Sequence, residues 1–427
     1  MNTYAYVNSR AGPGRLVSED SCIVDDGLGL YVVCDGMGAH AAGEVASSLA
    51  CEVIRRVVSE EDSATDPSRP ILECALLEAC RIIHDYGLSH PSARGLGTTA
   101  TAILVRDSSL WIGHVGDSRA YLIRDGQIHQ LTRDHTVIGE LVEQGVLSPE
   151  AASLSPYAHV LTRALGSHPV VLVDTLRVDL VAGDRIILCS DGVQPGLDGL
   201  RVALDAERRA NNGDQVDLAR LLVDEASRGG SDDDMTAVEV LVRACDCKQR
   251  EAEVVLTYET LAEMSLFEEL DFSQLALVVE HMRVRSVSEN EVVIRRGTAG
   301  REIFIILEGA LRAEREGKVV AEFTKGSHFG ELAALSDHPR STDVRAIIDS
   351  TLIELSYDAF QALVERDPVI GSKFYRALAE QICEQLLAMN ELLFDGGELK
   401  SGAGGVRNVV PVDFKKNPSA PAMRLVE

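Results

Sequence analysis

The chain has 427 residues, 45% of them hydrophobic and 25% charged, and its formal net charge is −26 at pH 7. This length is enough for two hydrophobic cores, and the acidic charge argues against nucleic acid or an anionic membrane as a partner. The sequence shows no signal peptide and no long apolar span, so we expect a cytoplasmic protein. The nine cysteines lack zinc-ligand spacing, which suggests reduced thiols.

Aspartates beside glycines end three hydrophobic, strand-like runs in the first half of the chain. These aspartates are Asp35, Asp117 and Asp191, and further acidic clusters lie at residues 18–20 and 231–234. Buried strands deliver side chains to fixed points, and carboxylates that meet at one rim repel one another unless cations lie between them. Oxygen ligands without a histidine cluster favour Mg²⁺ or Mn²⁺ over zinc.

Asp-Gly is also a common turn dipeptide, and a single copy most simply predicts a turn. Asp26-Gly27 and Asp125-Gly126 each separate two strand-like runs and predict ordinary hairpins. The three aspartates named above differ because the same strand-then-carboxylate pattern recurs at three distant places.

The residues around these aspartates resemble one known family. The motifs, in chain order, are RLVSED at 15–20, VCDGMGAH at 33–40, GTTA at 97–100, VGDSRAY at 115–121, LTRDH at 131–135, LTRALG at 161–166 and CSDG at 189–192. This order resembles the metal-dependent protein phosphatases, the type 2C or PPM family, over residues 1–245. The resemblance implies a four-layer α-β-β-α sandwich and hydrolysis of phosphoserine and phosphothreonine in phosphoproteins, with Ser/Thr kinases among the candidate substrates.

The resemblance also implies a role for each site residue. Asp35 and the Gly36 carbonyl would bridge two Mn²⁺ or Mg²⁺ ions, and Asp191 would complete one of them together with Asp233. Glu19 and Asp20 would hold waters coordinated to the ions, and Asp117 would contribute to a third ion. Arg15 would bind the substrate phosphate through its guanidinium. Two such ions would lower the pKa of a water that attacks phosphorus, and a guanidinium fork suits phosphate.

Three departures from the family pattern bear on these roles. Asp234 stands where an amide is common, and Asp232 leaves the register of the ligand open, although the following Met-Thr pair favours Asp233. Met37 stands where animal members carry a histidine proposed as general acid; His40 is a nearby candidate, and metal-bound water is the alternative.

Residues 136–159 match the flap of the family. A helix closed by a glycine C-cap is expected at 138–145. Flaps often select among protein substrates, so this segment is a candidate selectivity element; a plain surface excursion is the alternative.

The second half of the chain changes character. Residues 246–262 are charged and then amphipathic, which predicts a connector running into a helix. Short strands punctuated by glycines follow, and a helical pattern closes the unit. Even spacing of short strands predicts a small β-roll with flanking helices at 263–394, so the whole chain is expected to be an α+β protein. Residues 395–427 are rich in glycine and proline and predict a flexible tail.

Within the expected roll, GSHFGELAALSDHPRST at 326–342 resembles the phosphate-binding cassette of cyclic-nucleotide-binding domains. A short helical turn there would present free backbone N–H groups to an anion, Arg340 can pair with a phosphate, and Glu331 can accept from a ribose 2′-hydroxyl. The full set of expected contacts comprises Gly330, Glu331, Leu332, Ala333, Arg340 and Ser341. A hydroxyl residue directly after the arginine, here Ser341, occurs both in members that bind cyclic GMP and in members that bind cyclic AMP. We favour cyclic AMP as the ligand.

Three hypotheses remain. The first is a protein phosphatase regulated by a cyclic nucleotide. The second is the same phosphatase with a roll that only docks partners or dimerises. The third is a nucleotide-sensing binding protein with a decayed enzyme half, against which the intact acidic ligands speak. The sequence leaves the oligomeric state open.

Overall fold

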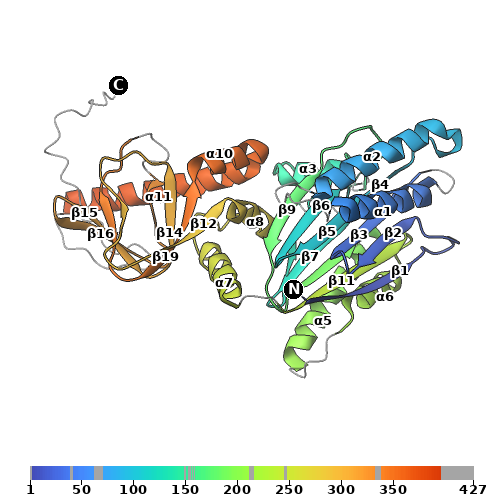
Figure 1. The fold of residues 1–427 in the computed structure, drawn as a ribbon, viewed down its shortest axis with the longest axis horizontal. Helices are drawn as coiled ribbons and strands as arrows, with labels where there is room; N and C mark the ends of the chain where they lie inside the picture. Colours follow the sequence, from blue (N-terminus) through green and yellow to red (C-terminus); the bar gives the residue numbers. More distant parts are fainter. Residues whose placement is uncertain are drawn as a thin grey trace. The chain divides into compact units, whose positions relative to one another are not determined.

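The computed structural model describes residues 2–395, except 39–41, 62–70, 149–150, 152–154, 156, 158, 211–215, 245–247 and 332–337. The chain divides into two compact units (Figure 1). The first comprises the residues up to 255 together with 271–280, and the second comprises 256–270 and the residues from 281 onward. No helix among the described residues is long and apolar enough to cross a membrane.

Two antiparallel sheets form the centre of the first unit. One contains, in spatial order, β1 (Asn2–Arg10), β11 (Met235–Ala244), β10 (Arg185–Cys189), β7 (Arg119–Arg124) and β8 (Gln127–Gln130). The other contains β2 (Asp20–Asp25), β3 (Leu30–Met37), β5 (Ala100–Arg106), β6 (Ser109–Val115) and β9 (Asp174–Asp179), with β4 (Gly97–Thr98) paired to β3.

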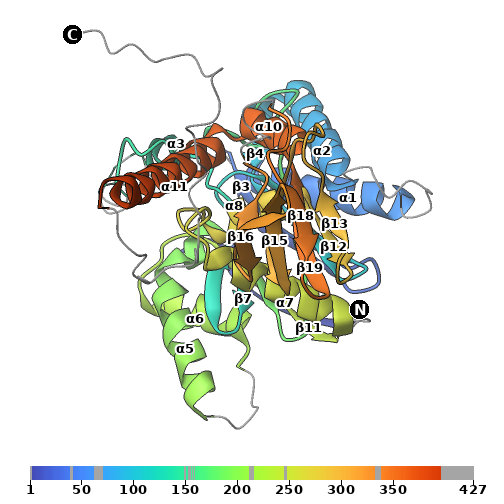
Figure 2. The same cartoon turned by 90° about the vertical axis from the view of Figure 1, so that its left-hand side faces the viewer.

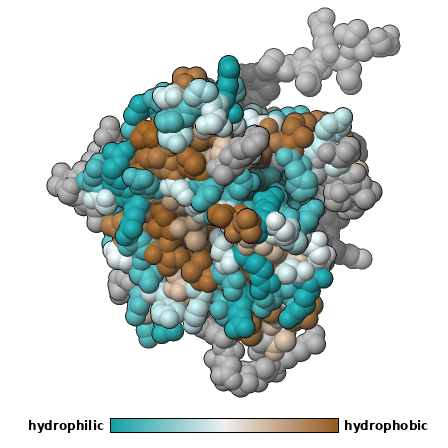
Figure 3. All heavy atoms as spheres, turned by 90° about the vertical axis from the view of Figure 1, so that its right-hand side faces the viewer, coloured by the Kyte–Doolittle hydropathy of each residue, from teal (hydrophilic) through white to brown (hydrophobic). Residues whose placement is uncertain are grey.

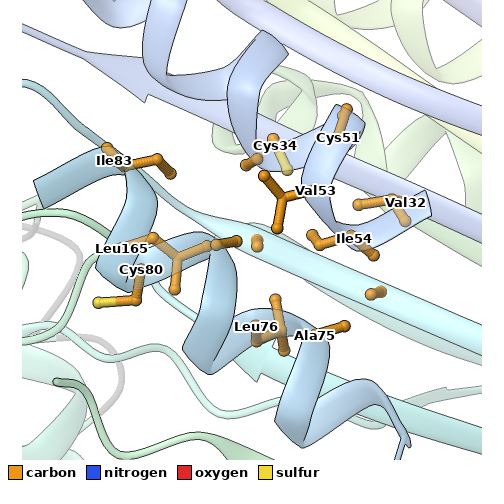
Figure 4. Close-up of a cluster of buried hydrophobic side chains, with 14 of the residues drawn as sticks. Val32, Cys34, Cys51, Val53, Ile54, Ala75, Leu76, Cys80, Ile83 and Leu165 are labelled. Atoms are coloured by element: carbon orange, nitrogen blue, oxygen red, sulfur yellow. The ribbon is translucent and has the colours of Figure 1, made fainter. Parts of the chain in front are cut away.

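Helices cover the outer face of each sheet. Helices α1 (Ala42–Glu61) and α2 (Ile71–Ser89) pack on β2, β3 and β5, whereas α5 (Leu197–Ala210) and α6 (Leu218–Arg228) pack on β7, β10 and β11. Figure 4 shows the first of these cores, to which both helices and the sheet contribute buried side chains, among them Val32, Ile54, Leu76, Ile83 and Leu165. The expected four-layer α-β-β-α sandwich is confirmed.

Strand β3 reads as a continuous hydrophobic run because both of its faces are buried. In β3, Val32 and Cys34 lie in the core with α1 and α2, and the alternate residues Tyr31 and Val33 are equally inaccessible to solvent. Successive strand residues point to opposite faces, and β3 also contacts β10 and β11 of the other sheet. The second face of β3 is therefore buried between the sheets.

Both predicted hairpins are present. Asp125 and Gly126 have φ angles of 51° and 72° and form the two-residue turn between β7 and β8, a conformation that Asp-Gly readily adopts. The turn at Asp26-Gly27 is longer than expected, because Asp25 pairs with Leu30 across four turn residues.

The first unit also contains shorter helices. Within its described residues, these include η1 (Pro91–Ala93), α3 (Val137–Glu143), η2 (Asp191–Gly196) and α8 (Phe272–Glu280). Helix α3 confirms the expected flap helix: Thr136 accepts a hydrogen bond from the Gly139 N–H at its start, and Gly145 adopts a φ of 69° after its end.

The second unit is a roll of two four-stranded sheets, whose strands are seen from another side in Figure 2. One sheet contains β12 (Met282–Val287), β19 (Ser350–Ser356), β14 (Glu302–Glu308) and β17 (His328–Phe329). The other contains β13 (Val292–Ile294), β18 (Asp343–Ala346), β15 (Ala310–Arg315) and β16 (Lys318–Thr324). Apolar residues of both sheets share one core, and α10 (Tyr357–Arg366) and α11 (Pro368–Asp395) follow the strands.

The segment between the two motif-bearing regions is helical. Helix α7 (Lys248–Ala262) occupies the expected connector, and the division between the units falls within it, after residue 255. Helix α8 then packs with the first unit, in contact with β8 and β9. The two units are therefore joined by more than one crossing of the main chain.

Candidate metal centre and nucleotide cassette

The carboxylates expected at one rim do meet there. Antiparallel pairing of β2 with β3 places Asp20 opposite Asp35, and Asp191 begins η2, separated from the end of β10 by Ser190 alone. The Asp35 carboxyl interacts electrostatically with Asp20, Asp191, Asp117 and Asp233. Residues that are up to 213 positions apart in the sequence thus share one site.

Burial and mutual repulsion make these groups poor acids. Burial raises the pKa of Asp20 and of Asp117 to about 7 each, with neighbouring carboxylates adding to the shift. The pKa of Asp35 is raised well above its ordinary value for the same two reasons. Among the described residues, buried Oδ1 atoms of Asp20 and Asp191 have no hydrogen-bond partner. Divalent cations would relieve both conditions, so the residues present fit the Mn²⁺ or Mg²⁺ ions expected from the sequence.

Glycine lets the backbone pack tightly beside these carboxylates. A Cβ on Gly36 would lie 2.1 Å from the Gly43 carbonyl oxygen and 2.6 Å from that of Glu19. A Cβ on Gly192 would lie 2.0 Å from the Asp234 carbonyl oxygen. No side chain fits at either position without a backbone shift, so both glycines are required for the close approach of the acidic segments.

A histidine that the sequence did not single out also reaches the site. The Nδ1 of His159 lies 3.5 Å from Asp191 Oδ2. Ligand atoms of Asp117, His159 and Asp191 lie within 4.8 Å of one another, an arrangement that could hold a metal ion. The position of His159 at the end of the expected flap was the only signal available.

Arg15 lies beside the acidic cluster, in contact with three carboxylates. Its Nη1 is 2.7 Å from Asp234 Oδ2, its Nη2 is 2.8 Å from Asp233 Oδ1, and Glu19 Oε2 is 3.7 Å from Nη1. Its side chain is 37% exposed. The guanidinium therefore has donors directed both at the protein and at solvent, as a phosphate-binding group needs.

Asp234, which replaces the more common amide, organises the segment that carries Arg15. One carboxylate oxygen accepts from the Gly12 N–H at 2.7 Å, and the other accepts from the Glu19 N–H at 2.7 Å and from Arg15. Three donors on two oxygens suit a carboxylate better than an amide, which offers one acceptor oxygen. Asp233 interacts electrostatically with Asp35 and Asp191, and Asp232 is exposed.

A buried hydroxyl network supports the bridging aspartate. Thr99 Oγ1 accepts from the Asp35 N–H at 2.9 Å and hydrogen-bonds to Ser118 Oγ at 2.7 Å. Thr98 Oγ1 donates to the Asp35 carbonyl oxygen at 2.8 Å. The GTTA motif was noted in the sequence without a role; the structure shows that it holds the end of β3.

In the second unit, Arg340 is a buried cation with protein partners. Its side chain is 5% exposed and lies 2.8 Å from Glu302 Oε2, and it donates to the Gly330 carbonyl oxygen at 2.9 Å. A Cβ on Gly330 would lie 2.7 Å from Arg340 Nη1. Glu302, which sequence reasoning missed, thus orients the arginine expected to meet phosphate. Ser341 is exposed.

Some expected site residues lie outside the described part of the chain. They are His40, Leu332 and Ala333. Glu331 is described and lies beside His328.

Comparison with known proteins agrees with this geometry. The family model described as "Protein phosphatase 2C" matches residues 15–224, and the one described as "Cyclic nucleotide-binding domain" matches residues 284–367. The phosphatase PhpP of Streptococcus pneumoniae is 34% identical over 179 residues, which are 41% of this chain and 72% of that protein.

Two further comparisons concern Mycobacterium tuberculosis. Its serine/threonine protein phosphatase PstP is 37% identical over 232 residues, which are 54% of this chain but only 43% of PstP. A crystal structure of PstP superposes with a TM-score of 0.50 at 34% identity and covers 56% of this chain and 99% of the crystallised one.

Proposed function

Because this chain belongs to the protein phosphatase 2C family, we propose that it hydrolyses phosphoserine and phosphothreonine in proteins with two or three Mn²⁺ or Mg²⁺ ions. The convergence of Asp20, Asp35, Asp191 and Asp233 on one rim carries the proposal. When bound, the ions would lower the pKa of a water molecule and so supply the attacking nucleophile at neutral pH.

The chain's own residues have distinct parts in this reaction. Asp35, Asp191 and Asp233 would hold the paired ions, and Asp117 with His159 would hold another. The five N–H donors of Arg15 allow it to bind phosphate while it keeps its contact with Asp234. That contact orients the guanidinium towards the rim before substrate arrives.

The substrate class rests on the surface as well as on the family. Beside Arg15, the side chains of Leu16 and Val17 are 101% and 56% exposed. On the face drawn in Figure 3, apolar areas are separated by hydrophilic ones. An exposed apolar pair next to the phosphate-binding residue favours a substrate with a polypeptide around its phosphate over a small phosphate ester.

The test is hydrolysis of a phosphothreonine peptide by the full chain. We expect turnover with Mn²⁺ or Mg²⁺ and none after chelation. If neither Mn²⁺ nor Mg²⁺ supports hydrolysis, the phosphatase proposal is contradicted and a decayed enzyme half is favoured.

We further propose that the second unit binds a cyclic nucleotide, preferably cyclic AMP, and that binding changes phosphatase turnover. Buried Arg340 with its orienting Glu302 supports phosphate binding. Helix α8 supports regulation, because it packs in the first unit although the residues on both sides of it belong to the second. Phe272 of α8 stacks on His129 with ring centroids 4.5 Å apart.

Regulation requires that the nucleotide bind the active and the less active arrangement unequally. Turnover should therefore change when cyclic AMP is titrated, and change less with cyclic GMP. If both nucleotides bind but turnover is constant, the regulatory part fails. If calorimetry detects no binding, a roll that only docks partners or dimerises is favoured instead.

A further inference from the structure

His328 of β17 is a nearly buried histidine of the cassette that contacts α11. Its side chain is 9% exposed. Its Nε2 lies 3.0 Å from Gln381 Oε1 of α11, and its Nδ1 lies 3.6 Å from Glu331 Oε2. One imidazole thus faces both the carboxylate expected to contact ribose and a helical residue 53 positions further along the chain.

The identity of the two partners determines the protonation of the ring. A carboxylate oxygen and an amide oxygen are both acceptors, so each ring nitrogen needs a hydrogen, and only the imidazolium has two. Burial alone would lower the pKa of His328, but the Glu331 carboxylate and Gln381 outweigh it and raise the pKa above its ordinary value. The geometry therefore describes a His328–Glu331 ion pair.

His328 and Glu331 lie close together without forming a hydrogen bond. The distance of 3.6 Å is longer than a hydrogen bond, and both Nδ1 of His328 and Oε2 of Glu331 are buried without a hydrogen-bond partner among the described residues. Two complementary atoms that face each other in this way need only a small shift of the Glu331 side chain to join. Oε1 of the same carboxylate would then be left for a ligand.

We propose that His328 is a positioning residue for ribose recognition. Its imidazolium holds Glu331 Oε2, so that the carboxylate is oriented to accept from the 2′-hydroxyl of a cyclic ribonucleotide. Its other ring nitrogen anchors the same unit to Gln381, so that occupation of the cassette is transmitted to α11. The inference rests on the nucleotide site proposed above and adds a residue that the cassette resemblance does not assign.

The experiment is calorimetric titration of the full chain with cyclic AMP and with 2′-deoxy cyclic AMP. We expect the wild-type protein to prefer the ribonucleotide by about tenfold or more, the scale of a hydrogen bond to a charged group. His328→Ala should reduce this preference to less than about threefold while the affinity for the deoxy analogue changes little. Unchanged deoxy binding also shows that the variant is folded.

Two further variants make the assignment specific. His328→Gln, which keeps a donor but no charge, should give an intermediate preference. In a Glu331→Ala background, adding His328→Ala should have no further effect on the preference, because His328 acts through Glu331. A purely structural role would lower the affinities for both ligands equally in every background.

The outcomes separate this inference from the one beneath it. If the wild-type protein binds neither ligand, the nucleotide site itself is wrong. If it binds both equally, or if it discriminates and His328→Ala discriminates equally well, the role of His328 is wrong and the nucleotide site stands.

Discussion

At the scale of single residues, the metal centre depends on groups that are unfavourable on their own. Burial and repulsion raise the pKa values of Asp20, Asp35 and Asp117, and Arg15 contacts other acids, Glu19, Asp233 and Asp234. Such a site favours cation binding, because each bound ion replaces repulsion between carboxylates by attraction between carboxylates and the ion.

Replacing Arg15 tests its proposed role in binding phosphate. Arg15→Lys should lower kcat/KM by about 10- to 100-fold, mainly through KM, because a lysine cannot contact Asp234 and phosphate with one planar fork. The matched control is Arg10→Lys, which alters an exposed ion pair with Asp224 at 2.8 Å and should leave both constants nearly unchanged. Equal kinetics of the two variants would remove Arg15 from the site.

The sequence predicted the aspartates because strand ends place side chains reliably. It did not predict His159, Glu302 or the role of Asp234, since each acts through a contact with a residue distant in the chain, such as Asp234 with Gly12. No local pattern records such a pairing. The sequence shows that Asp234 replaces the amide common in the family, but it does not show the three groups that donate hydrogen bonds to the Asp234 carboxylate.

At the scale of elements, the close contact between Gly36 of β3 and Gly43 of α1 fixes the end of β3 that carries Asp35. Gly36→Ala should abolish Mn²⁺-dependent turnover or destabilise the fold by several kcal/mol, because its Cβ would overlap the Gly43 carbonyl oxygen at 2.1 Å. Gly27→Ala is the control: its Cβ would meet only Asp25 Oδ1 at 3.4 Å. Kinetics and thermal melts measure the turnover and stability of the two variants. A fully active and stable Gly36→Ala protein would contradict the close contact between Gly36 and Gly43.

Helix α8 is the element that we expect to transmit the nucleotide signal. Phe272→Ala removes a ring stacked on His129 and placed 5.9 Å from Arg124 Cζ. It should at least halve the effect of nucleotide on turnover and leave nucleotide affinity within about threefold. Glu280→Ala, at the exposed end of the same helix, is the control. An undiminished response in Phe272→Ala would exclude this route.

The elements themselves were largely predictable, and their partners were less so. Burial of both faces explains the continuous hydrophobic run of β3, and Thr136 and Gly145 mark both ends of α3. The packing of α8 with the first unit was not foreseen, because the apolar periodicity of a helix does not identify the core that it covers.

At the scale of the whole molecule, the acidic site links stability to pH and metal. In the folded state, Asp20 and Asp117 have pKa values of about 7, above their ordinary value of 3.8. Between these two pH values, the metal-free folded state therefore binds more protons than the unfolded state. Their contribution to stability is present at low pH and is lost as pH rises through about 7.

Mn²⁺ should therefore raise Tm far more at pH 8 than at pH 5.5, where protons compete for the ligands. Thermal melts with and without Mn²⁺ measure this difference. A Tm increase that is the same at both pH values would show that the raised pKa values do not belong to metal ligands.

The most direct test of the account is to count ions by calorimetric titration of the metal-free chain with Mn²⁺. We predict at least two ions per wild-type chain, and a loss of tight binding in Asp35→Asn, whereas the surface variant Asp224→Asn binds as the wild type does. Fewer than two ions, or wild-type binding by Asp35→Asn, would contradict the claim that these distant aspartates form one metal centre.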